Sequence, residues 1–374
     1  MDQLLREWPP GYGGVERVAH ELASELNVFV YSFDVQSHSL SGFDSLPVSY
    51  SRIRLPAFNI FGRLYLPIPS KALFRLLFSR RPLHGHLPSP AVLFVLILAK
   101  IIRPSRHISA HWHCFLDPDT GLTGFLYFVY QHLALYLLPF LSLVVTTSPL
   151  LAHELECCGL PPARIFTLPC CLSQQLEKSC LALPFPDVRY GQPLRLLFIG
   201  RLDTYKRLDW LLIALSELNT PFQLTVVGDG PYRSRFQNLA LATFPLGSPV
   251  RFLGRLTEDE KLKQLSDSDV LVLPSDRSNE AFGIVQLEAM AAGRISLAFD
   301  HPRSGMGWVA QLPGLPWSQS REGLVEVLVR LAQNPSLRYQ LSLQSRDRYL
   351  TLFARDIWLN QLDRLVASAE TGNV

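Results

Sequence analysis

The stretch DVLVLPSDRSNEAFGIVQLEAMAAG, residues 269–293, joins a short apolar run to a polar turn and then to an apolar helix. DVLVLPS has the composition of a buried strand, and GIVQLEAMAA has the small and apolar residues of a buried helix. Gly293 follows at a position that suits the residue just after a helix end. This order predicts one β-α step of a parallel sheet.

The same alternation occurs on the N-terminal side of this stretch. Other apolar runs predicted as strands are NVFVYSF (27–33), LSLVVTTS (141–148), LRLLFIG (194–200), FQLTVVG (222–228) and VRFLG (250–254). Amphipathic segments between them include RLDWLLIALSEL (207–218) and EDEKLKQLS (258–266). Strands separated by helices of this length predict right-handed βαβ units and parallel sheets.

The chain has 374 residues, which is enough for two domains. The alternation breaks once, over 174–193, where helical periodicity fades and three prolines occur. We therefore predict an α/β protein with two Rossmann-like domains. Their expected extents are 1–175 and 194–350, with a linker over 176–193 and a final helix over 351–374 that packs back towards the N-terminal domain.

The charge distribution in the N-terminal half is uneven. No acidic residue occurs between Asp44 and Asp117, whereas the same stretch contains ten Lys and Arg residues. The stretch also contains the apolar runs FGRLYLPIPSKALFRLLF (61–78) and AVLFVLILAKIIR (91–103). Basic residues mixed with apolar ones favour binding to the anionic face of a membrane. The alternative is a solvated basic face beside buried core helices. Nucleic acid is the less favoured partner because leucine and isoleucine runs interleave with the charges.

One segment, 122–145, is long enough to cross a bilayer, but Gln131, His132 and Pro139 interrupt it. We predict a buried or membrane-facing helix followed by a strand, with a membrane-spanning helix as the less favoured alternative. The chain's first residues, MDQLLREWPP, do not have the pattern of a signal peptide. Six cysteines in so long a chain do not make a disulfide framework, so we expect reduced thiols and a cytoplasmic protein.

Ligands of open parallel sheets bind beyond the carboxyl ends of the strands. In the C-terminal half, glycine or charge follows four predicted strands, and we expect one ligand cleft at that edge. The residues concerned are Gly200, Arg201 and Lys206 after the first strand, Gly228 to Gly230 after the second, Gly254 after the third, and Pro274 to Gly283 after the fourth.

Two carboxylates flank the start of the predicted helix in 269–293. Glu280 lies in the turn before it, and Glu288 lies one to two turns inside it. Free backbone N–H groups of Phe282, Gly283 and Ile284 would suit a phosphate at this helix start. A ligand with a diphosphate between a ribose and a hexose would meet both carboxylates, and a nucleotide sugar has that shape.

Arg201 and Lys206 supply the positive charge that a diphosphate needs as it leaves. A metal ion is the alternative counter-charge, and the D-x-D patterns at 117–119 and 267–269 are candidate sites for it. So short a pattern arises by chance, so we predict no metal and no cofactor.

Two further features lie in the N-terminal half. The glycines of WPPGYGG (8–14) do not make a dinucleotide fingerprint, because Glu16 occupies the third glycine position. Gly13 and Gly14 form either a flexible turn suited to a diphosphate across an interdomain cleft or an ordinary turn before a helix. Histidines occur at alternate positions, as His84 with His86 and His111 with His113. Such pairs could bind zinc, but we favour His113 as a hydrogen-bond partner of a sugar or acceptor.

Several segments resemble, in the same order, those of the retaining GT-B glycosyltransferases of family 4 (group 1), of the bacterial polysaccharide type. The segments are PPGYGGVERVAHELA, VVTTSPLLAHEL, FIGRLDTYKRLDWLL, LTVVGDGP, VRFLGRLTEDEKLKQLSDSDVLVLPS and EAFGIVQLEAMAAG. The resemblance covers about residues 8–310, and its Glu-x7-Glu pattern is the specific part. It implies a GT-B fold, in which an acceptor domain and a nucleotide-sugar domain have parallel sheets that face an interdomain cleft.

The resemblance also implies an activity and a set of roles. The enzyme would move a hexose from a nucleotide-diphosphate sugar to a glycan or lipid-linked acceptor, retaining the anomeric configuration without a metal. Glu280 would contact the donor sugar, Glu288 the ribose, and Arg201 and Lys206 the diphosphate. The remaining expected donor contacts are Gly13, Gly14, Gly200, Gly254, Phe282, Gly283 and Ile284, with His113 at the reaction centre.

Departures from the family pattern leave alternatives open. Pro169-Cys170-Cys171 stands where Pro-Asn-Gly is usual, and SGMGWV (304–309) replaces the usual stretch after Gly293. A nucleotide-sugar epimerase and a catalytically silent nucleotide-sugar-binding relative are the two alternative functions. The basic stretch favours a location on the inner face of the membrane, as a peripheral protein.

Overall fold

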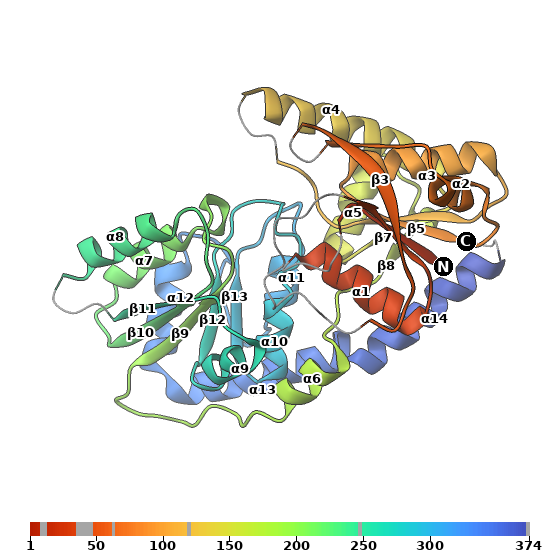
Figure 1. Ribbon diagram of the computed structural model, residues 1–374. Helices are drawn as coiled ribbons and strands as arrows, with labels where there is room; N and C mark the ends of the chain where they lie inside the picture. Colours follow the sequence, from red (N-terminus) through yellow and green to blue (C-terminus); the bar gives the residue numbers. More distant parts are fainter. Residues whose placement is uncertain (8–12, 35–47, 62–63, 118–120, 246–248, 372–374) are drawn as a thin grey trace. The chain divides into compact units, whose positions relative to one another are not determined.

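The computed structural model describes the chain except for residues 8–12, 35–47, 62–63, 118–120, 246–248 and 372–374 (Figure 1). The chain divides into two compact units, one of Met1–Cys170 with Trp358–Val374 and one of Cys171–Ile357. This division precedes the expected linker at 176–193. The beginning of that segment belongs to a helix of the second unit, α6 (Gln174–Leu181).

The first unit is built on an eight-stranded sheet with the order β4-β3-β2-β1-β5-β6-β7-β8. All neighbouring strands are parallel except β3 and β4. Figure 1 shows α3 and α4 on one side of this sheet and α1 on the other. The strands are β1 (Asp2–Leu5), β2 (Val30–Asp34), β3 (Arg52–Phe61), β4 (Leu64–Pro67), β5 (Leu83–Leu87), β6 (Ile108–Trp112), β7 (Leu143–Thr146) and β8 (Ile165–Thr167). The helices are α1 (Gly14–Leu26), α2 (Lys71–Phe78), α3 (Pro90–Ile102), α4 (Gly121–Leu137), α5 (Pro149–Cys157) and most of α14 (Arg355–Thr371).

The polar strand β1 lies at the centre of this sheet, and its polar side chains are paired there. Asp2 and Gln3 are fully buried. The Asp2 carboxylate accepts a hydrogen bond from the backbone N–H of Phe29 and forms an ion pair with Arg81 at 3.2 Å. Burial raises the pKa of Asp2, while the nearby Arg81 opposes that rise. Buried polar groups with partners are compatible with a central strand.

The second unit contains a five-stranded parallel sheet with the order β11-β10-β9-β12-β13. Side chains alternate across it, so that Leu196 and Phe198 pack with α7 and α12, whereas Leu197 and Ile199 pack with α9 and α10. The strands are β9 (Leu194–Ile199), β10 (Phe222–Val227), β11 (Val250–Gly254), β12 (Val270–Leu273) and β13 (Ile295–Ala298). The other helices are α7 (Leu208–Ser216), α8 (Arg233–Thr243), α9 (Glu258–Ser266), α10 (Val285–Ala291), α11 (Met306–Ala310), α12 (Leu324–Gln333) and α13 (Pro335–Leu352).

The helix expected within 122–145 is α4, and the strand that follows it is β7. With its extension to Phe140, this helix is long and apolar enough to cross a membrane, and only 22% of its apolar window is buried. Leu122, Phe125 and Tyr136 are 70%, 61% and 71% exposed. The alternative of a buried helix is therefore wrong. A face of this kind, bearing large apolar side chains, is typical of a surface that contacts a membrane or partner.

Candidate active site

In the second unit, the glycines that follow the strands gather at the carboxyl edge of the sheet. Gly200 follows β9 and donates to the Val227 carbonyl at 3.0 Å, while Gly228 donates to the carbonyl of Gly254 at 2.7 Å. Gly228 has a φ of 129°, and a Cβ at this position would collide with the Gly200 carbonyl oxygen. These loops pack backbone to backbone, so no Cβ of these glycines blocks the approach of a ligand to this part of the edge.

Lys206 and Glu280 form an ion pair at this edge. Lys206 ends a short 3-10 turn, η3 (Thr204–Lys206), and its side chain is 8% exposed, against 18% for Glu280. The loop before α11 fixes the turn that carries Glu280. Ser304 Oγ donates to the Glu280 carbonyl at 2.6 Å, and the backbone N–H of Gly305 donates to Ala281 at 2.7 Å. SGMGWV thus supports the Glu280 turn, which the sequence did not indicate.

Arg201 differs from Lys206 in being open to solvent. Its side chain is 59% exposed and lies 3.4 Å from the carboxylate of Asp203. An exposed pair of this kind is weak and can be exchanged for a ligand at little cost. Of the two residues expected to contact the diphosphate, Lys206 is buried and already paired with Glu280. Arg201 is accessible to solvent.

The backbone before α10 offers hydrogen-bond donors. The N–H groups of Phe282, Gly283 and Ile284 have no acceptor among the residues that the structure describes. Gly283 has a φ of 69°, which favours glycine, and a Cβ there would lie 3.1 Å from the amide nitrogen of Gln286. These donors follow Glu280 in the same segment, and their contact with a donor phosphate stays a prediction.

Glu288 lies in a different setting from the one expected for a ribose contact. It is fully buried within α10, and its carboxylate pairs with Lys261 of α9 at 2.8 Å. Lys261 also lies 2.8 Å from Glu258. A buried carboxylate needs such a partner. No sequence signal indicates Lys261, because this lysine occurs in an ordinary charged helix, EDEKLKQLS.

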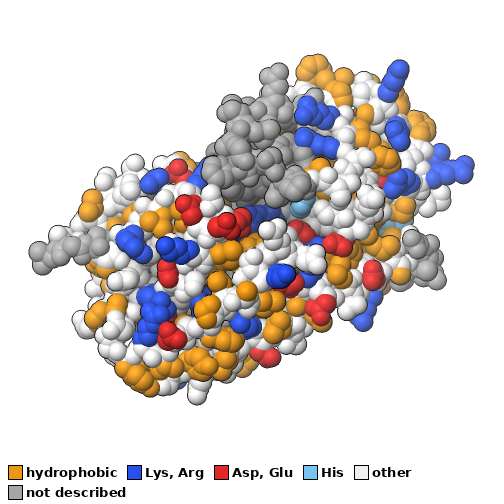
Figure 2. Space-filling view, turned by 60° about the horizontal axis from the view of Figure 1, so that its bottom comes forward, with side chains coloured by type: hydrophobic (Ala, Val, Ile, Leu, Met, Phe, Trp, Pro, Cys, Tyr) orange, Lys and Arg blue, Asp and Glu red, His pale blue; other side chains and the backbone are white. Residues whose placement is uncertain are grey.

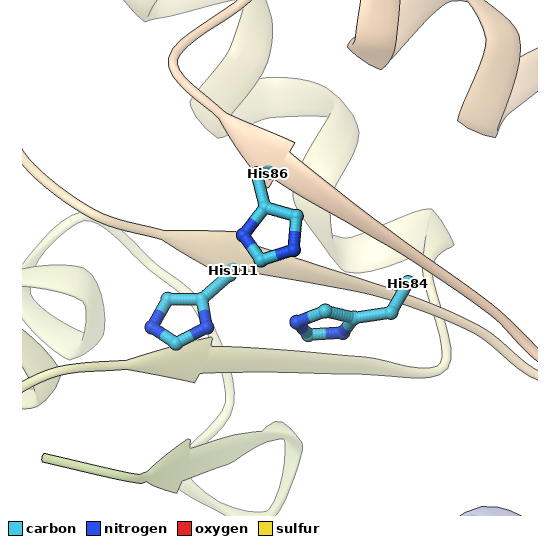
Figure 3. Close-up of side chains that lie close together, drawn as sticks. All are labelled: His84, His86 and His111. Atoms are coloured by element: carbon cyan, nitrogen blue, oxygen red, sulfur yellow. The ribbon is translucent and has the colours of Figure 1, made fainter. Parts of the chain in front are cut away.

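Four histidines cluster along β5 and β6 in the first unit. His84 and His86 belong to β5, His111 belongs to β6, and His113 follows it. The rings of His111 and His113 stack with centroids 4.1 Å apart, which confirms that alternate positions place them on one side. Figure 3 shows His84, His86 and His111 turned towards one another. Burial lowers the pKa of all four, that of His113 to about 3, so the rings are neutral near pH 7.

A chain of hydrogen bonds determines which nitrogen of His113 carries a proton. The Gln3 amide nitrogen donates to the Met1 carbonyl at 2.8 Å, so its oxygen accepts from His86 Nε2–H at 2.9 Å. A neutral His86 then has a bare Nδ1, which must accept from His113 Nε2–H at 2.9 Å. His113 therefore keeps a bare Nδ1, a suitable acceptor for a hydroxyl proton.

Nitrogen atoms of His84, His86 and His111 lie within 4.8 Å of one another, a spacing that a small movement could convert into a metal site. Both nitrogens of His86 are already engaged, by Gln3 and His113. The absence of a metal from the function remains a prediction from the sequence.

Gly13 and Gly14 stand at the start of α1. Gly13 is its N-cap with a φ of −80°, so any residue type could adopt this backbone, and both glycines are exposed. Residues 8–12 of the same motif lie outside the described part of the chain. A contact between these glycines and the donor phosphates stays a prediction.

Comparison with known proteins assigns each half of the chain to a family. Residues 12–175 match the model described as Glycosyltransferase Family 4, and residues 183–306 match that of Glycosyl transferases group 1. The chain belongs to the GT-B glycosyltransferases. The predicted fold class is thereby confirmed, since both units of this GT-B protein are α/β with sheets that are parallel except for the β3–β4 pair.

Individual relatives agree with this assignment. D-rhamnosyltransferase WbpZ of Pseudomonas aeruginosa is 38% identical over 103 residues, which span 27% of this chain and 26% of that protein. The O-antigen chain mannosyltransferase C of Escherichia coli is 25% identical over 364 residues, 93% of this chain and 92% of that protein. The structure of Anabaena HepE in complex with UDP has a TM-score of 0.73 at 15% identity, covers 98% of this chain and 100% of that one, and so supports the GT-B fold.

Proposed function

We propose that this GT-B protein transfers a hexose from a nucleotide-diphosphate sugar to a hydroxyl of a lipid-linked or surface polysaccharide intermediate. The transfer retains the anomeric configuration and uses no metal. The observation that carries this proposal is the Lys206–Glu280 ion pair beside the free N–H groups of residues 282–284. The names of the relatives support a hexosyl donor and a polysaccharide acceptor, because they include an O-antigen chain mannosyltransferase and a rhamnosyltransferase.

In this proposal, each group meets one part of the donor. Arg201 and Lys206 neutralise the charge that develops on the leaving diphosphate, and the N–H groups of residues 282–284 hold its oxygens. Glu280 accepts hydrogen bonds from hexose hydroxyls and orients Lys206. The bond from the anomeric carbon to the diphosphate breaks while the acceptor hydroxyl attacks the same face, and its proton passes to the leaving phosphate. The bare Nδ1 of His113 accepts a hydroxyl hydrogen bond.

A screen of nucleotide sugars by thermal stabilisation tests this function. A donor at about one hundred times its Kd should stabilise the fold by about 2.7 kcal/mol and raise the melting temperature. The stabilising donors are then incubated with lipid-linked acceptors, and products are identified by mass spectrometry. Transfer supports the proposal. Conversion of the donor sugar alone would identify an epimerase, and binding without any reaction would identify a silent relative.

We also propose that the protein is cytoplasmic and peripheral on the inner face of the membrane. The exposed apolar face of α4 supports this, together with the acid-free basic stretch of the same unit. Figure 2 shows Lys and Arg side chains among hydrophobic ones at the upper right, within the N-terminal unit. Apolar side chains that enter the acyl boundary and cations that meet anionic headgroups act together in such proteins.

Replacing Leu122 and Leu126 of α4 with Ser should lower the fraction that floats with anionic vesicles by about tenfold, because each leucine contributes up to about 1.5–3 kcal/mol when buried. These side chains are 70% and 44% exposed. The control changes Leu241 and Leu350 of the second unit, which are 63% and 45% exposed. Flotation that falls equally in both variants, or in neither, would contradict a role of α4.

A further inference from the structure

The N-terminal unit contains a second polar site, at the edge of its sheet opposite to His113. A cavity of about 980 Å³ opens there beside the residues that precede three strands, Pro82 before β5, His107 before β6 and Ser142 before β7. The strands of a parallel sheet separate their two edges by the length of the strand, about 16 Å for five residues. The cavity therefore lies away from His113 and its bare Nδ1, at the end of the strands near His84.

The lining of this cavity is strongly basic. Its charged and titratable members are Arg80, Lys100, Arg106, His107 and Arg164, and the described lining includes no Asp or Glu. None of the four Lys and Arg side chains forms an ion pair among the residues that the structure describes. Burial and the charge of Arg164 lower the pKa of Lys100, and burial and the charge of Lys100 lower that of His107. Lys100 and Arg164 thus repel each other, whereas the Asp2 carboxylate partly compensates the charge of Arg106.

Part of this basic character has a structural explanation. Arg106 donates to the carbonyls of Leu76 and Arg81, both at 2.7 Å, and Lys100 donates to the Arg106 carbonyl at 3.1 Å. Basic side chains near helix ends commonly serve main-chain carbonyls in this way. These hydrogen bonds account for part of the positive charge, because they satisfy main-chain carbonyls such as that of Leu76 in the last turn of α2.

Two buried nitrogens are left over. Arg106 is 4% exposed, and its Nη2 has no hydrogen-bond partner among the residues that the structure describes. Nε2 of His107 is also buried and has no partner within the described ranges. Buried polar groups in this state cost free energy unless a ligand or water satisfies them. An anion in the cavity would relieve the repulsion between Lys100 and Arg164, and it would lie beside the buried Arg106 and His107 side chains that line the cavity.

We propose that this basic cavity binds a phosphate group carried by a larger molecule. Phosphate oxygens suit the fork of donors on guanidinium groups, and a multiply charged anion suits four cations. The volume exceeds the needs of one phosphate and lies within the range of small-molecule sites. Apolar side chains complete the lining, including Phe140, which is 59% exposed at the end of the apolar stretch Gly121–Phe140. The phosphate belongs either to an anionic lipid headgroup or to a soluble phosphorylated compound.

The test compares Arg80→Gln/Arg164→Gln with Lys71→Gln/Arg54→Gln. All four residues are exposed and lie in the same unit, both variants remove two positive charges, and Lys71 and Arg54 lie outside the cavity lining. Two probes are used: pyrophosphate by calorimetry, and flotation with phosphatidylcholine vesicles with or without about 30% phosphatidylglycerol. Because Arg201 and Lys206 could bind pyrophosphate, the titration is repeated with Arg201→Ala/Lys206→Ala, which keeps the cavity intact.

The proposal requires that the cavity variant weaken binding of at least one probe by about tenfold or more, while the control stays within about twofold of the wild type. A loss with pyrophosphate identifies a soluble phosphate compound, and a loss with vesicles alone identifies a lipid headgroup. The proposal is overturned if neither probe distinguishes the two variants, because binding would then reflect net charge only. It is also overturned if pyrophosphate binding disappears in the Arg201→Ala/Lys206→Ala protein and the vesicle arm shows no difference.

Discussion

Replacing Glu280 with Gln is expected to lower the turnover number by about two to three orders of magnitude, the effect of removing one electrostatic contact to a developing charge. Glu280 pairs with Lys206, whose side chain is only 8% exposed, so the amide would leave this cation without its counter-charge. The Lys206 ammonium would then bind the diphosphate in an altered position, and the hexose would lose a carboxylate acceptor. The measurement is the initial rate of sugar transfer at saturating donor, together with the nucleotide affinity, which should change little.

Asp276 provides a matched control for Glu280. It lies in the same loop, is also 18% exposed, and pairs with Arg207 at 2.5 Å. Asp276→Asn should leave turnover within about threefold of the wild type, because its partner Arg207 is not one of the proposed contacts to the donor. Lys206→Ala should lower turnover as strongly as Glu280→Gln, and the double variant should be little worse than either, because two residues that act as a unit are not additive. Unchanged turnover in Lys206→Ala, or loss of nucleotide binding alone in Glu280→Gln, would contradict these roles.

Replacing Lys261 with Met is expected to lower the free energy of unfolding by about 3–5 kcal/mol, the usual effect of leaving one member of a buried ion pair unpaired. Glu288 is fully buried, and Lys261 lies 2.8 Å from its carboxylate. Methionine keeps much of the lysine stem but supplies neither charge nor donor. The measurement is chemical denaturation followed by circular dichroism, with the slope of the transition compared between variants.

The other partner of Lys261 supplies the control for this experiment. Glu258 is 56% exposed at the start of α9, so Glu258→Gln should change stability by less than about 1 kcal/mol. Adding Glu288→Gln to Lys261→Met should restore part of the loss, because the buried charge is then removed. If Lys261→Met keeps its stability but loses nucleotide affinity, the lysine serves the ligand and the pair is not structural. If Glu288 also binds the ribose, Glu288→Gln should weaken nucleotide binding in a protein that is still folded.

The local parts of this fold could be predicted well, because local physics determines them. The segments 250–254 and 258–266 coincide with β11 and α9. A capping box between Thr257 and Glu260 marks the start of α9 within the sequence itself. The order of strands and helices then leads to a parallel sheet, which gathers Gly200, Gly228 and Gly254 at one edge.

The candidate site was predictable only in part. The Glu-x7-Glu spacing indicated two carboxylates near one helix, yet Glu280 pairs with Lys206 at the sheet edge while Glu288 is buried against Lys261. Their different settings depend on what other segments bring to each carboxylate, and a linear spacing contains no record of that. The support of the Glu280 turn by Ser304 is equally non-local.

The sequence by itself determined the α/β class, the two halves and the residue types at the sheet edge, because periodicity, caps and turns act over a few neighbouring residues. Only the tertiary structure decided that α4 is exposed, that Lys261 partners Glu288, and that Gln3, 83 residues before His86, selects the proton-bearing nitrogen of His113. The physical reason is that burial and hydrogen-bond direction depend on contacts between distant parts of the chain, which exist only after the chain has folded.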